Sequence, residues 1–350
     1  MSWEENVRRV EPYVPGEQPK TADKVIKLNA NEFPYPPTPL VREAIEMLDT
    51  DLLRMYPSST AEPLVEAIAA HYGFEKDEVF VGVGSDDVLA NSFLTFFHSK
   101  KPILFPDVTY SFYDVWAQVY DIPYELQPLD ADFRIVKEDY FKENGGIVIA
   151  NPNAPTGISE PVEFIEEIVK RNPGSVVIID EAYVDFGGES ALLLTRKYNN
   201  VLVVQTFSKS RAFAGMRIGF AVGNKVLIRY LNDIKFSVNS YTMNRTAIYY
   251  GIKAVEDEVY FRETLSKVIT TRERCKAELT KLGFACTDTR TNFIFASHKT
   301  IPAKELFTYL KTKQIYVRYF EKPRIDNYLR ITIGTDEQMD ALLMALRAKC

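Results

Sequence analysis

Two chemically useful side chains, Asp180 and Lys209, follow apolar runs of the sequence. Asp180 ends the run VVIID, and Lys209 comes three residues after the run VLVVQT. Ligands of parallel sheets bind beyond the carboxyl ends of the strands, so we expect both side chains in one crevice. A carboxylate there can keep a pyridine nitrogen protonated, and a lysine amine can condense with an aldehyde. Either residue alone is typical of a surface turn, but together they predict a cofactor that carries both groups.

A site for a phosphate group is predicted at the same edge. Ser85 and Asp86 follow the run VFVGVG and begin a segment with an apolar stripe, which puts free backbone N–H groups at a helix start. Thr206, Ser208 and Arg217 offer hydroxyl groups and a guanidinium to complete the cup. The alternatives are a plain helix cap at Ser85 or Asp86 and a structural salt bridge at Arg217.

The elements that must position these residues show an α/β pattern, in which short apolar runs alternate with segments of helical periodicity. Runs that are apolar throughout predict strands buried on both faces of a mostly parallel sheet. Residues 162–171 carry one apolar stripe and predict a helix between two such strands. The predicted strands are VFVGVG, ILF, IVIA, VVIID, VLVVQT and RIGFAVG.

Past about residue 240 the pattern changes to long helical stretches, followed by the alternating strands NFIFAS and YLRITIG. Thr335 and Gln338 form a capping-box signature at the start of a final helix. This predicts a second, smaller α+β domain. We expect an N-terminal segment (1–45) that packs with the small domain and with a partner chain, a large cofactor-binding domain (46–245) and a small C-terminal domain (246–350).

Composition excludes several classes of function. The chain has 350 residues and a net charge of −6, with charges scattered along it, so no basic stripe suits a nucleic acid. No apolar run reaches the length of a membrane span or forms a signal core, which predicts a cytoplasmic protein that does not bind membranes. The 3 cysteines and 3 histidines lack metal-type spacing, so we expect no metal.

The motifs resemble a known class of enzymes. NPNAPTG (151–157), DEAYVDF (180–186) and TFSKSRAFAGMRIGF (206–220) are similar, in order and spacing, to the fold-type I aminotransferases, which use pyridoxal 5′-phosphate. PYVPGEQ (12–18) and KLNANEFPYPP (27–37), with RMYPSS further on, resemble the histidinol-phosphate aminotransferase family, over nearly the whole chain. The resemblance implies a fold-type I architecture, a large domain with a mostly parallel sheet and a smaller α+β domain.

The resemblance also implies roles around the cofactor. Lys209 would hold the cofactor and then act as the base, Asp180 would pair with the pyridine nitrogen, and Tyr183 would meet the ring hydroxyl. Tyr110 would stack on the ring, although the tyrosines are equally suited to fill an aromatic core. The phosphate contacts would be the backbone of Ser85 and Asp86 and the side chains of Thr206, Ser208 and Arg217.

Two further roles concern a partner chain and the substrate. By the resemblance, Tyr56 would reach the phosphate in the partner subunit, which implies a homodimer with shared active sites. Arg330 would hold the anionic end of the substrate, and Arg318 would lie near the substrate phosphate, with Tyr13 beside them. The alternative for both arginines is a structural role within the small domain.

One motif departs from the family pattern. Where the family usually has Asn-Pro-Thr-Gly, this chain has Ala154 before Pro155, so the side-chain amide that bonds the ring hydroxyl is missing. Asn153 or Asn151 can replace it through a shifted turn, or Tyr183 can act without help; we assign Asn153 to the cofactor site.

The activity that the resemblance implies is transamination between L-glutamate and imidazole-acetol phosphate, which gives L-histidinol phosphate and 2-oxoglutarate. The resemblance thus implies small-molecule substrates, namely an amino acid and a phosphorylated molecule. The alternatives are a threonine-phosphate decarboxylase and an aromatic aminotransferase of the same fold. A cofactor-binding module of a transcription regulator is a third possibility, but it needs a winged-helix domain for which this N-terminus is too short.

Overall fold

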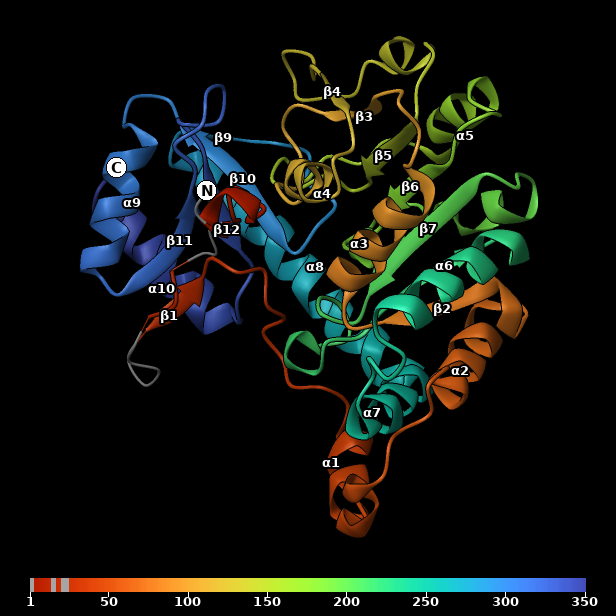
Figure 1. Ribbon diagram of the computed structural model, residues 1–350. Helices are drawn as coiled ribbons and strands as arrows, with labels where there is room; N and C mark the ends of the chain where they lie inside the picture. The colour runs from red at the N-terminus through yellow and green to blue at the C-terminus, as the bar shows by residue number, and fades with distance from the viewer. Residues whose placement is uncertain (1–2, 14–16, 20–24) are drawn as a thin grey trace.

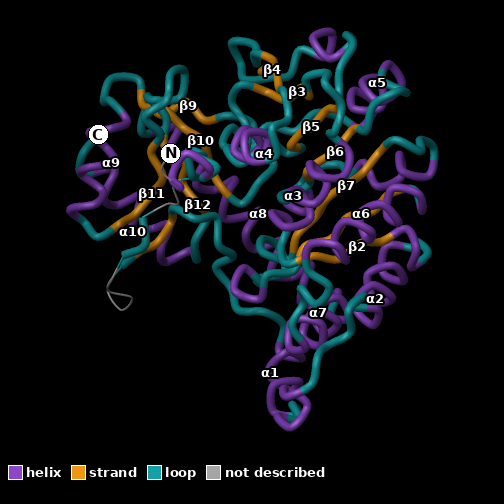
Figure 2. The backbone as a smooth tube through the Cα atoms, in the orientation of Figure 1, coloured by secondary structure: helices purple, strands orange, loops and turns teal. Residues whose placement is uncertain are grey.

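The computed structural model describes residues 3–13, 17–19 and 25–350, so residues 14–16 of the PYVPGEQ motif lie outside the described part. Two separate sheets form the frame of the molecule, and the long helix α8 (Glu258–Lys281) runs between them (Figures 1 and 2). The larger sheet lies with α2 to α7, and the smaller sheet lies with α9 and α10 near the C-terminus.

The larger sheet has seven strands in the order β2-β8-β7-β6-β5-β3-β4. Strands β4, β3, β5, β6 and β7 are parallel, and β8 is antiparallel to both β7 and β2. The prediction of a mostly parallel α/β sheet is therefore confirmed. Its strands are β2 (Val79–Gly82), β3 (Ile103–Pro106), β4 (Tyr124–Gln127), β5 (Gly146–Ala150), β6 (Val177–Asp180), β7 (Val201–Thr206) and β8 (Gly219–Gly223).

Helices cover both faces of this sheet, which explains why its central strands are apolar throughout. One face packs on Ile68 of α2, Ile165 of α5 and Ala247 of α7. The other face packs on Leu89 of α3, Trp116 of α4 and Leu231 of α6. The helices are α1 (Pro39–Glu46), α2 (Glu62–Tyr72), α3 (Ser85–Phe96), α4 (Tyr113–Val119), α5 (Val162–Arg171), α6 (Lys225–Val238) and α7 (Arg245–Glu256).

The smaller sheet has five strands in the order β1-β11-β12-β10-β9. Its first strand comes from the N-terminal segment and pairs in parallel with β11, which ties the two ends of the chain together. Thr335 and Gln338 form the predicted capping box at the start of the last helix. The elements are β1 (Ile26–Leu28), β9 (Phe284–Cys286), β10 (Phe293–His298), β11 (Ile315–Tyr319), β12 (Leu329–Thr332), α9 (Ala303–Thr312) and α10 (Asp336–Arg347).

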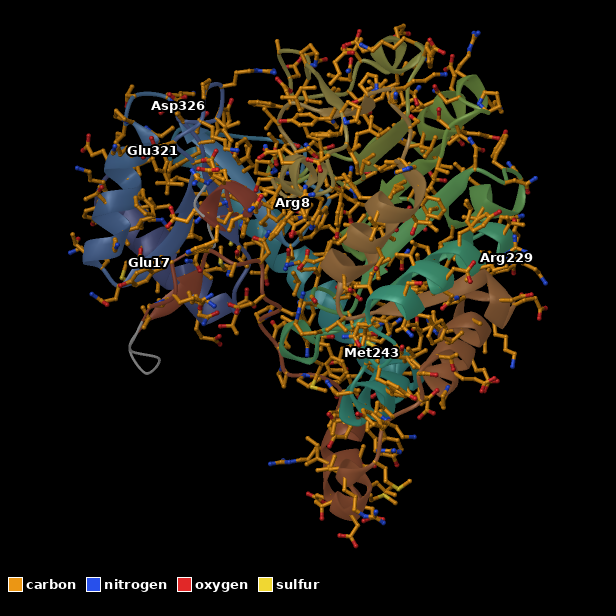
Figure 3. All side chains as sticks on the ribbon, in the orientation of Figure 1. Arg8, Glu17, Arg229, Met243, Glu321 and Asp326 are labelled. Atoms are coloured by element: carbon orange, nitrogen blue, oxygen red, sulfur yellow. The ribbon has the colours of Figure 1, made fainter. Side chains whose placement is uncertain are left out.

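Short 3-10 helices complete the described elements, and one of them, η1, precedes an anchor of the N-terminal segment. Arg8 donates to the carbonyl of Val119 at 2.7 Å and pairs with Asp121 at 2.7 Å, at the end of α4 (Figure 3). The 3-10 helices are η1 (Trp3–Asn6), η3 (Thr50–Arg54), η4 (Lys76–Glu78), η5 (Lys137–Tyr140), η6 (Val184–Phe186), η7 (Ala191–Arg196) and η8 (Ala214–Met216). The division into domains at residues 45 and 245 stays a prediction.

Candidate active site

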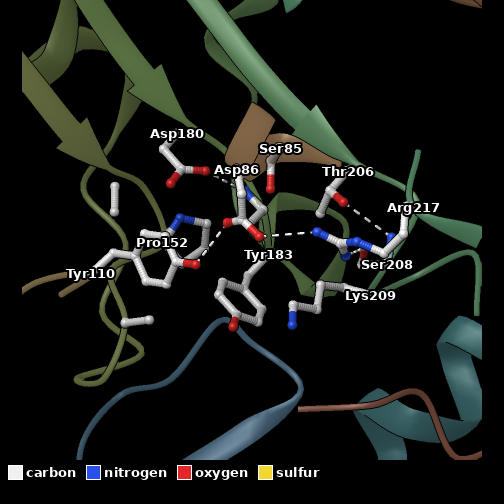
Figure 4. A pocket seen from close by; sticks show the side chains of 13 residues that line it. Ser85, Asp86, Tyr110, Pro152, Asp180, Tyr183, Thr206, Ser208, Lys209 and Arg217 are labelled. Atoms are coloured by element: carbon white, nitrogen blue, oxygen red, sulfur yellow. Dashed lines mark hydrogen bonds and ion pairs between the residues drawn. The ribbon is translucent and has the colours of Figure 1, made fainter. Parts of the chain in front are cut away.

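A cavity of about 530 Å³, including its mouth, opens beyond the carboxyl ends of β6 and β7 (Figure 4). Asp180 is the last residue of β6, and Lys209 lies in the turn after β7. The cavity brings together nine residues that the sequence assigned to the cofactor: Ser85, Asp86, Tyr110, Asp180, Tyr183, Thr206, Ser208, Lys209 and Arg217.

The carboxylate of Asp180 is buried, with 5% of the residue exposed. Tyr113 donates its hydroxyl to Asp180 Oδ2 at 2.7 Å, and the backbone N–H of Ala182 donates to Oδ1 at 3.3 Å. Burial raises the pKa of Asp180 to about 6, and these two hydrogen bonds act against the rise. Within the described part of the chain Asp180 forms no ion pair, so a buried acid here lacks a cation and suits a protonated ring nitrogen.

This pKa should make the stability of the cofactor-free protein depend on pH. The Asp180 carboxyl titrates near 3.8 in the unfolded chain and near 6 in the fold. Between these values the folded state binds more protons, so its stability falls as the pH rises. The Asp180→Asn variant cannot lose that proton. Its stability relative to the parent should therefore increase by on the order of 1–3 kcal/mol between about pH 4 and about pH 7.

Urea unfolding of both cofactor-free proteins at the two pH values measures this change. Burial also raises the pKa of Glu181, to about 7, but Glu181 is present in both proteins and its effect cancels. A stability difference that stays constant with pH would contradict the prediction.

Lys209 and Tyr183 face each other across the cavity (Figure 4). The Lys209 Nζ atom lies 5.6 Å from the centre of the Tyr183 ring, and no hydrogen bond or ion pair joins it to another described residue. The edge of the Tyr183 ring packs against Phe293 with 5.2 Å between ring centres, which fixes the ring in place. A primary amine without a partner is the nucleophile that condensation with an aldehyde requires.

The predicted phosphate cup is built on the start of α3. Gly84 precedes this helix with φ at +86°, and no side chain caps the helix start among the described residues. A Cβ atom on Gly219 would lie 2.3 Å from the backbone nitrogen of Ser85, so this glycine lets β8 touch the helix start. The open N–H groups and the helix dipole suit an anion at this point.

Arg217 supplies the positive charge of the cup. Its guanidinium pairs with Asp86 Oδ2 at 3.0 Å and donates to Ser208 Oγ at 3.4 Å. Its backbone is in the left-handed region with φ at +54°, a conformation that non-glycine residues adopt mainly where the surroundings require it. Thr206 Oγ1 accepts from the N–H of Ser208 at 3.1 Å and so shapes the turn that leads to Lys209.

The Tyr110 ring forms a wall of the cavity (Figure 4). Its hydroxyl donates to Asp86 Oδ1 at 2.7 Å, so the Asp86 carboxylate is held by both Tyr110 and Arg217. Burial and the nearby Asp86 charge raise the pKa of Tyr110 well above its usual value, which keeps this hydroxyl protonated as a donor.

A wider groove adjoins the cavity, and Tyr110 and Ala154 line both. The groove contains the three residues assigned to the substrate, Tyr13, Arg318 and Arg330. Tyr13 stacks on Phe112 with 4.3 Å between ring centres. The guanidinium of Arg318 lies 5.3 Å from the centre of the Phe320 ring.

Arg330 is a partly buried cation of this groove. Its Nη2 atom donates to the carbonyl of Asn29 at 3.2 Å, whereas its buried Nε atom has no hydrogen-bond partner among the described residues. Burial lowers the pKa of Arg330, with Arg318 contributing in the same direction. A buried guanidinium that is only partly bonded suits a carboxylate or phosphate ligand.

Two residues that were predicted to bind the cofactor, Asn153 and Tyr56, line neither the cavity nor the groove. The Asn153 amide is fully used elsewhere: its Oδ1 accepts from Thr109 at 2.7 Å, and its Nδ2 donates to the Val108 carbonyl at 2.9 Å and to Thr156 Oγ1 at 3.0 Å. Asn153 thus holds the turn before Ala154 in shape. Tyr56 is 78% exposed and stacks on Tyr241 with 4.6 Å between ring centres, away from the cavity.

Sequence reasoning missed two residues that contact the predicted ones. Tyr113 bonds Asp180, and the only signal in the sequence was its place in the aromatic segment TYSFYDVW. Asn31 donates its amide to the Tyr183 hydroxyl at 2.8 Å, from a position 152 residues away. No local pattern predicts such a long-range contact.

The chain matches the family described as aminotransferase class I and II over residues 23–346. It belongs to this family. The aminotransferase is 52% identical to histidinol-phosphate aminotransferase 1 from Hydrogenovibrio crunogenus, over 98% of this chain and 96% of that protein. The enzyme is therefore an aminotransferase, and its cofactor is pyridoxal 5′-phosphate.

Solved structures share the fold of this aminotransferase. Histidinol-phosphate aminotransferase from Sinorhizobium meliloti, solved in complex with pyridoxal-5′-phosphate, superposes with a TM-score of 0.84 at 22% identity, over 93% of this chain and 91% of that one. L-threonine-O-3-phosphate decarboxylase from Porphyromonas gingivalis superposes with a TM-score of 0.80 at 19% identity, over 93% of this chain and 99% of that one. The fold alone therefore does not separate the two reactions.

The cavity of this aminotransferase fits its cofactor. Asp180 offers a buried carboxylate for the ring nitrogen, Lys209 a free amine for the aldehyde, and the start of α3 an anion site for the phosphate. Among the residues that the structure describes, no group of three or more histidine, cysteine or acidic side chains is placed to hold a metal ion. No described helix is long and apolar enough to cross a membrane.

Proposed function

We propose that this aminotransferase interconverts L-histidinol phosphate and imidazole-acetol phosphate, with 2-oxoglutarate and L-glutamate as the second pair. The observation that carries the proposal is the cavity with Asp180 and Lys209, which adjoins a groove that holds Arg318 and Arg330. Both substrate pairs are anionic and would find cations there. The 52% identity to a histidinol-phosphate aminotransferase over nearly the whole chain supports this choice of substrate.

The residues would divide the chemistry among them. When bound, pyridoxal phosphate supplies an electron sink for the negative charge that develops at the substrate α-carbon. Asp180 would keep the ring nitrogen protonated, and Tyr183 would donate its hydroxyl to the ring oxygen. The Lys209 amine would hold the cofactor and, once the substrate has replaced it, its Nζ would carry the proton away from the α-carbon. Ser85, Ser208, Thr206 and Arg217 would hold the phosphate.

Decarboxylation of threonine phosphate is the competing reaction, because such an enzyme has the same fold. Purified holoenzyme should show a kcat/KM for L-histidinol phosphate at least about tenfold above that for L-phenylalanine, since a charge-assisted hydrogen bond to the phosphate is worth roughly 1.5–3 kcal/mol. It should release no carbon dioxide from threonine phosphate. Parallel assays of 2-oxoglutarate-dependent transamination and of carbon dioxide release make the comparison. Carbon dioxide release, or a preference for phenylalanine, would overturn the assignment.

We further propose that the chain forms a homodimer through the segment 45–56, which projects from the body together with α1 (Figure 1). Large apolar side chains are exposed there, among them Met47 at 75% and Tyr56 at 78%. A concentration of exposed apolar groups marks an interaction surface. A second copy of the chain fits this surface, because Tyr56 does not line the cofactor cavity of its own chain and would line that of the partner chain.

Sedimentation equilibrium should therefore give twice the chain mass of 40.0 kDa. Leu53→Glu should shift the mass toward one chain, because it places a charge in the apolar contact. Leu193→Glu, at an apolar residue exposed on η7, serves as the matched control and should leave the dimer intact. A parent protein with the mass of one chain would contradict the dimer.

We also propose a cellular location and a division into domains. A biosynthetic enzyme that acts on small phosphorylated metabolites would work in the cytoplasm, which cell fractionation tests. The division of the chain at residues 45 and 245 into an N-terminal segment, a large domain and a small domain is tested by limited proteolysis, which should cut near these boundaries.

A further inference from the structure

Asn31 connects three parts of the molecule at the wall of the cavity. It follows β1 in the N-terminal segment, and only 1% of it is exposed. Its Nδ2 atom donates to the hydroxyl oxygen of Tyr183 at 2.8 Å. Its backbone carbonyl accepts from Asn292 Nδ2 at 2.9 Å, and its φ of +55° is a conformation that asparagine tolerates better than most residues.

The orientation of the Asn31 amide is determined by Thr332. The Thr332 hydroxyl donates to Asn31 Oδ1 at 3.0 Å and accepts from the Asn31 backbone N–H at 3.0 Å. A threonine hydroxyl has one hydrogen, and here it goes to the amide oxygen. The amide nitrogen therefore faces Tyr183, and the Tyr183 oxygen acts as an acceptor in this contact.

This contact leaves the hydrogen of the Tyr183 hydroxyl free to point into the cavity, which Tyr183 lines together with Lys209. Ala154 also lines the cavity, but its side chain is a methyl group, which cannot donate a hydrogen bond. The Asn153 amide makes all its bonds outside the cavity. Tyr183 is thus the hydroxyl donor that this wall offers to a bound ring.

We propose that Asn31 is a positioning residue for Tyr183: its amide donates to the Tyr183 oxygen and so turns the Tyr183 proton toward the ring oxygen of the cofactor. The inference rests on the proposed function, since it assigns Tyr183 to that oxygen. It also explains how the chain works with Ala154 in its motif, because the missing amide is replaced by one that acts through Tyr183 from the N-terminal segment.

The arrangement has a measurable consequence in the holoenzyme. A hydroxyl that accepts one hydrogen bond becomes a better donor in the next. Its bond to the ring oxygen of a bound cofactor would be strongest when that oxygen carries a full negative charge, and a hydrogen bond to a charged form favours that form. Asn31 and Tyr183 therefore lower the pH at which the visible spectrum of the bound cofactor changes.

The test is a spectroscopic pH titration of the holoenzymes. Asn31→Ala should raise the midpoint by about half a pH unit to one unit, which corresponds to the net worth of one hydrogen bond. Tyr183→Phe should raise the midpoint further. In the Tyr183→Phe background, Asn31→Ala should cause no additional shift, because its effect passes through the lost hydroxyl. Asn144→Ala is the matched control, a buried amide that bonds Asn172 away from the cavity, and should titrate like the parent.

The charged groups that face Tyr183 are Lys209 and Arg330, and both stay in place in every variant. If Asn31→Ala proves insoluble, Thr332→Val releases the same amide and should shift the midpoint in the same direction. A parental midpoint in Asn31→Ala, or in Thr332→Val where that variant replaces it, would overturn the proposal. So would a shift that persists in the Tyr183→Phe background. Borohydride should fix the cofactor to Lys209 in the parent; a label elsewhere would remove the proposed function itself.

Discussion

Asp180→Ala should lower the rate of transamination by about 10²–10³-fold and leave cofactor binding measurable, because the variant loses a preorganised charge and not the phosphate cup. The Asp180 carboxylate is buried, bonded by Tyr113 and without an ion pair among the described residues, so its charge is directed at whatever occupies the cavity. Without it, the ring nitrogen would lose its proton and the α-carbon its stabilisation. Asp180→Ala should therefore reduce the transamination rate without abolishing cofactor binding.

Single-turnover rates with L-histidinol phosphate, measured at saturating cofactor, would show the loss, and a cofactor titration would show the retained binding. Tyr113→Phe is an informative partner variant, because it removes a hydrogen bond from the carboxylate and leaves the charge in place. It should cost less than Asp180→Ala, because it removes one hydrogen bond worth roughly 1.5–3 kcal/mol and leaves the carboxylate charge at the ring nitrogen. Equal single-turnover rates in Asp180→Ala and the parent would show that Asp180 only caps the strand end.

The fold was predictable where burial dictates the residue types. The strands that are apolar throughout, such as VLVVQT, lie between helices on both faces of the sheet, and the capping box at Thr335 begins the last helix as predicted. Strand β4 (YELQ) escaped prediction because it is the edge strand, where three of its four residues are exposed and leave no apolar run. Strand β1 escaped prediction because it has only three residues and its pairing depends on the distant β11.

The site was predictable where chain neighbours share a role. Asp180 ends β6 and Lys209 follows β7, and these two strands pair directly, so the topology of a parallel sheet places both residues in one cavity. Asn31 was not predictable, because its partners Tyr183 and Thr332 are brought to it by the packing of the two sheets and not by any local pattern. The role predicted for Tyr56 also requires a second chain, since its exposed ring does not line the cofactor cavity of its own subunit.

Arg330→Ala should lower kcat/KM for both L-glutamate and L-histidinol phosphate by at least about tenfold, because one cation would hold the anionic group of either substrate. Arg330 is partly buried in the groove beside the cofactor cavity, and its buried Nε atom lacks a hydrogen-bond partner within the described residues. A guanidinium with a buried, unpaired N–H is already desolvated in the empty enzyme, so it gains an ion pair when a carboxylate binds. Arg330→Lys should retain more activity than Arg330→Ala but less than the parent, since an ammonium group cannot form a bidentate hydrogen bond to a carboxylate.

Arg318→Ala should instead discriminate between the substrates. Arg318 and Arg330 both line the wider groove, and neither lines the cofactor cavity. We propose, from the family resemblance, that Arg318 lies at the phosphate end of the longer substrate. We expect kcat/KM for L-histidinol phosphate to fall by about tenfold or more, and that for L-glutamate to change by much less. The ratio of the two values, measured for Arg318→Ala and Arg330→Ala, therefore separates a cation that serves both substrates from one that serves the phosphate.

Arg324 in the same groove offers the matched control for a structural role. Its guanidinium already pairs with Asp107 at 2.7 Å and donates to the carbonyl of Leu129 at 2.9 Å, so it ties the small sheet's side of the groove to the large one. Arg324→Ala should lower the melting temperature and reduce kcat/KM for both substrates to a similar extent. If Arg330→Ala gave this same pattern, its role would be structural, and an unchanged kcat/KM for both substrates would remove Arg330 from the site. A large loss of kcat/KM with a parental melting temperature is the result that a substrate-binding arginine requires, because the partly bonded guanidinium of Arg330 contributes little to holding the empty fold together.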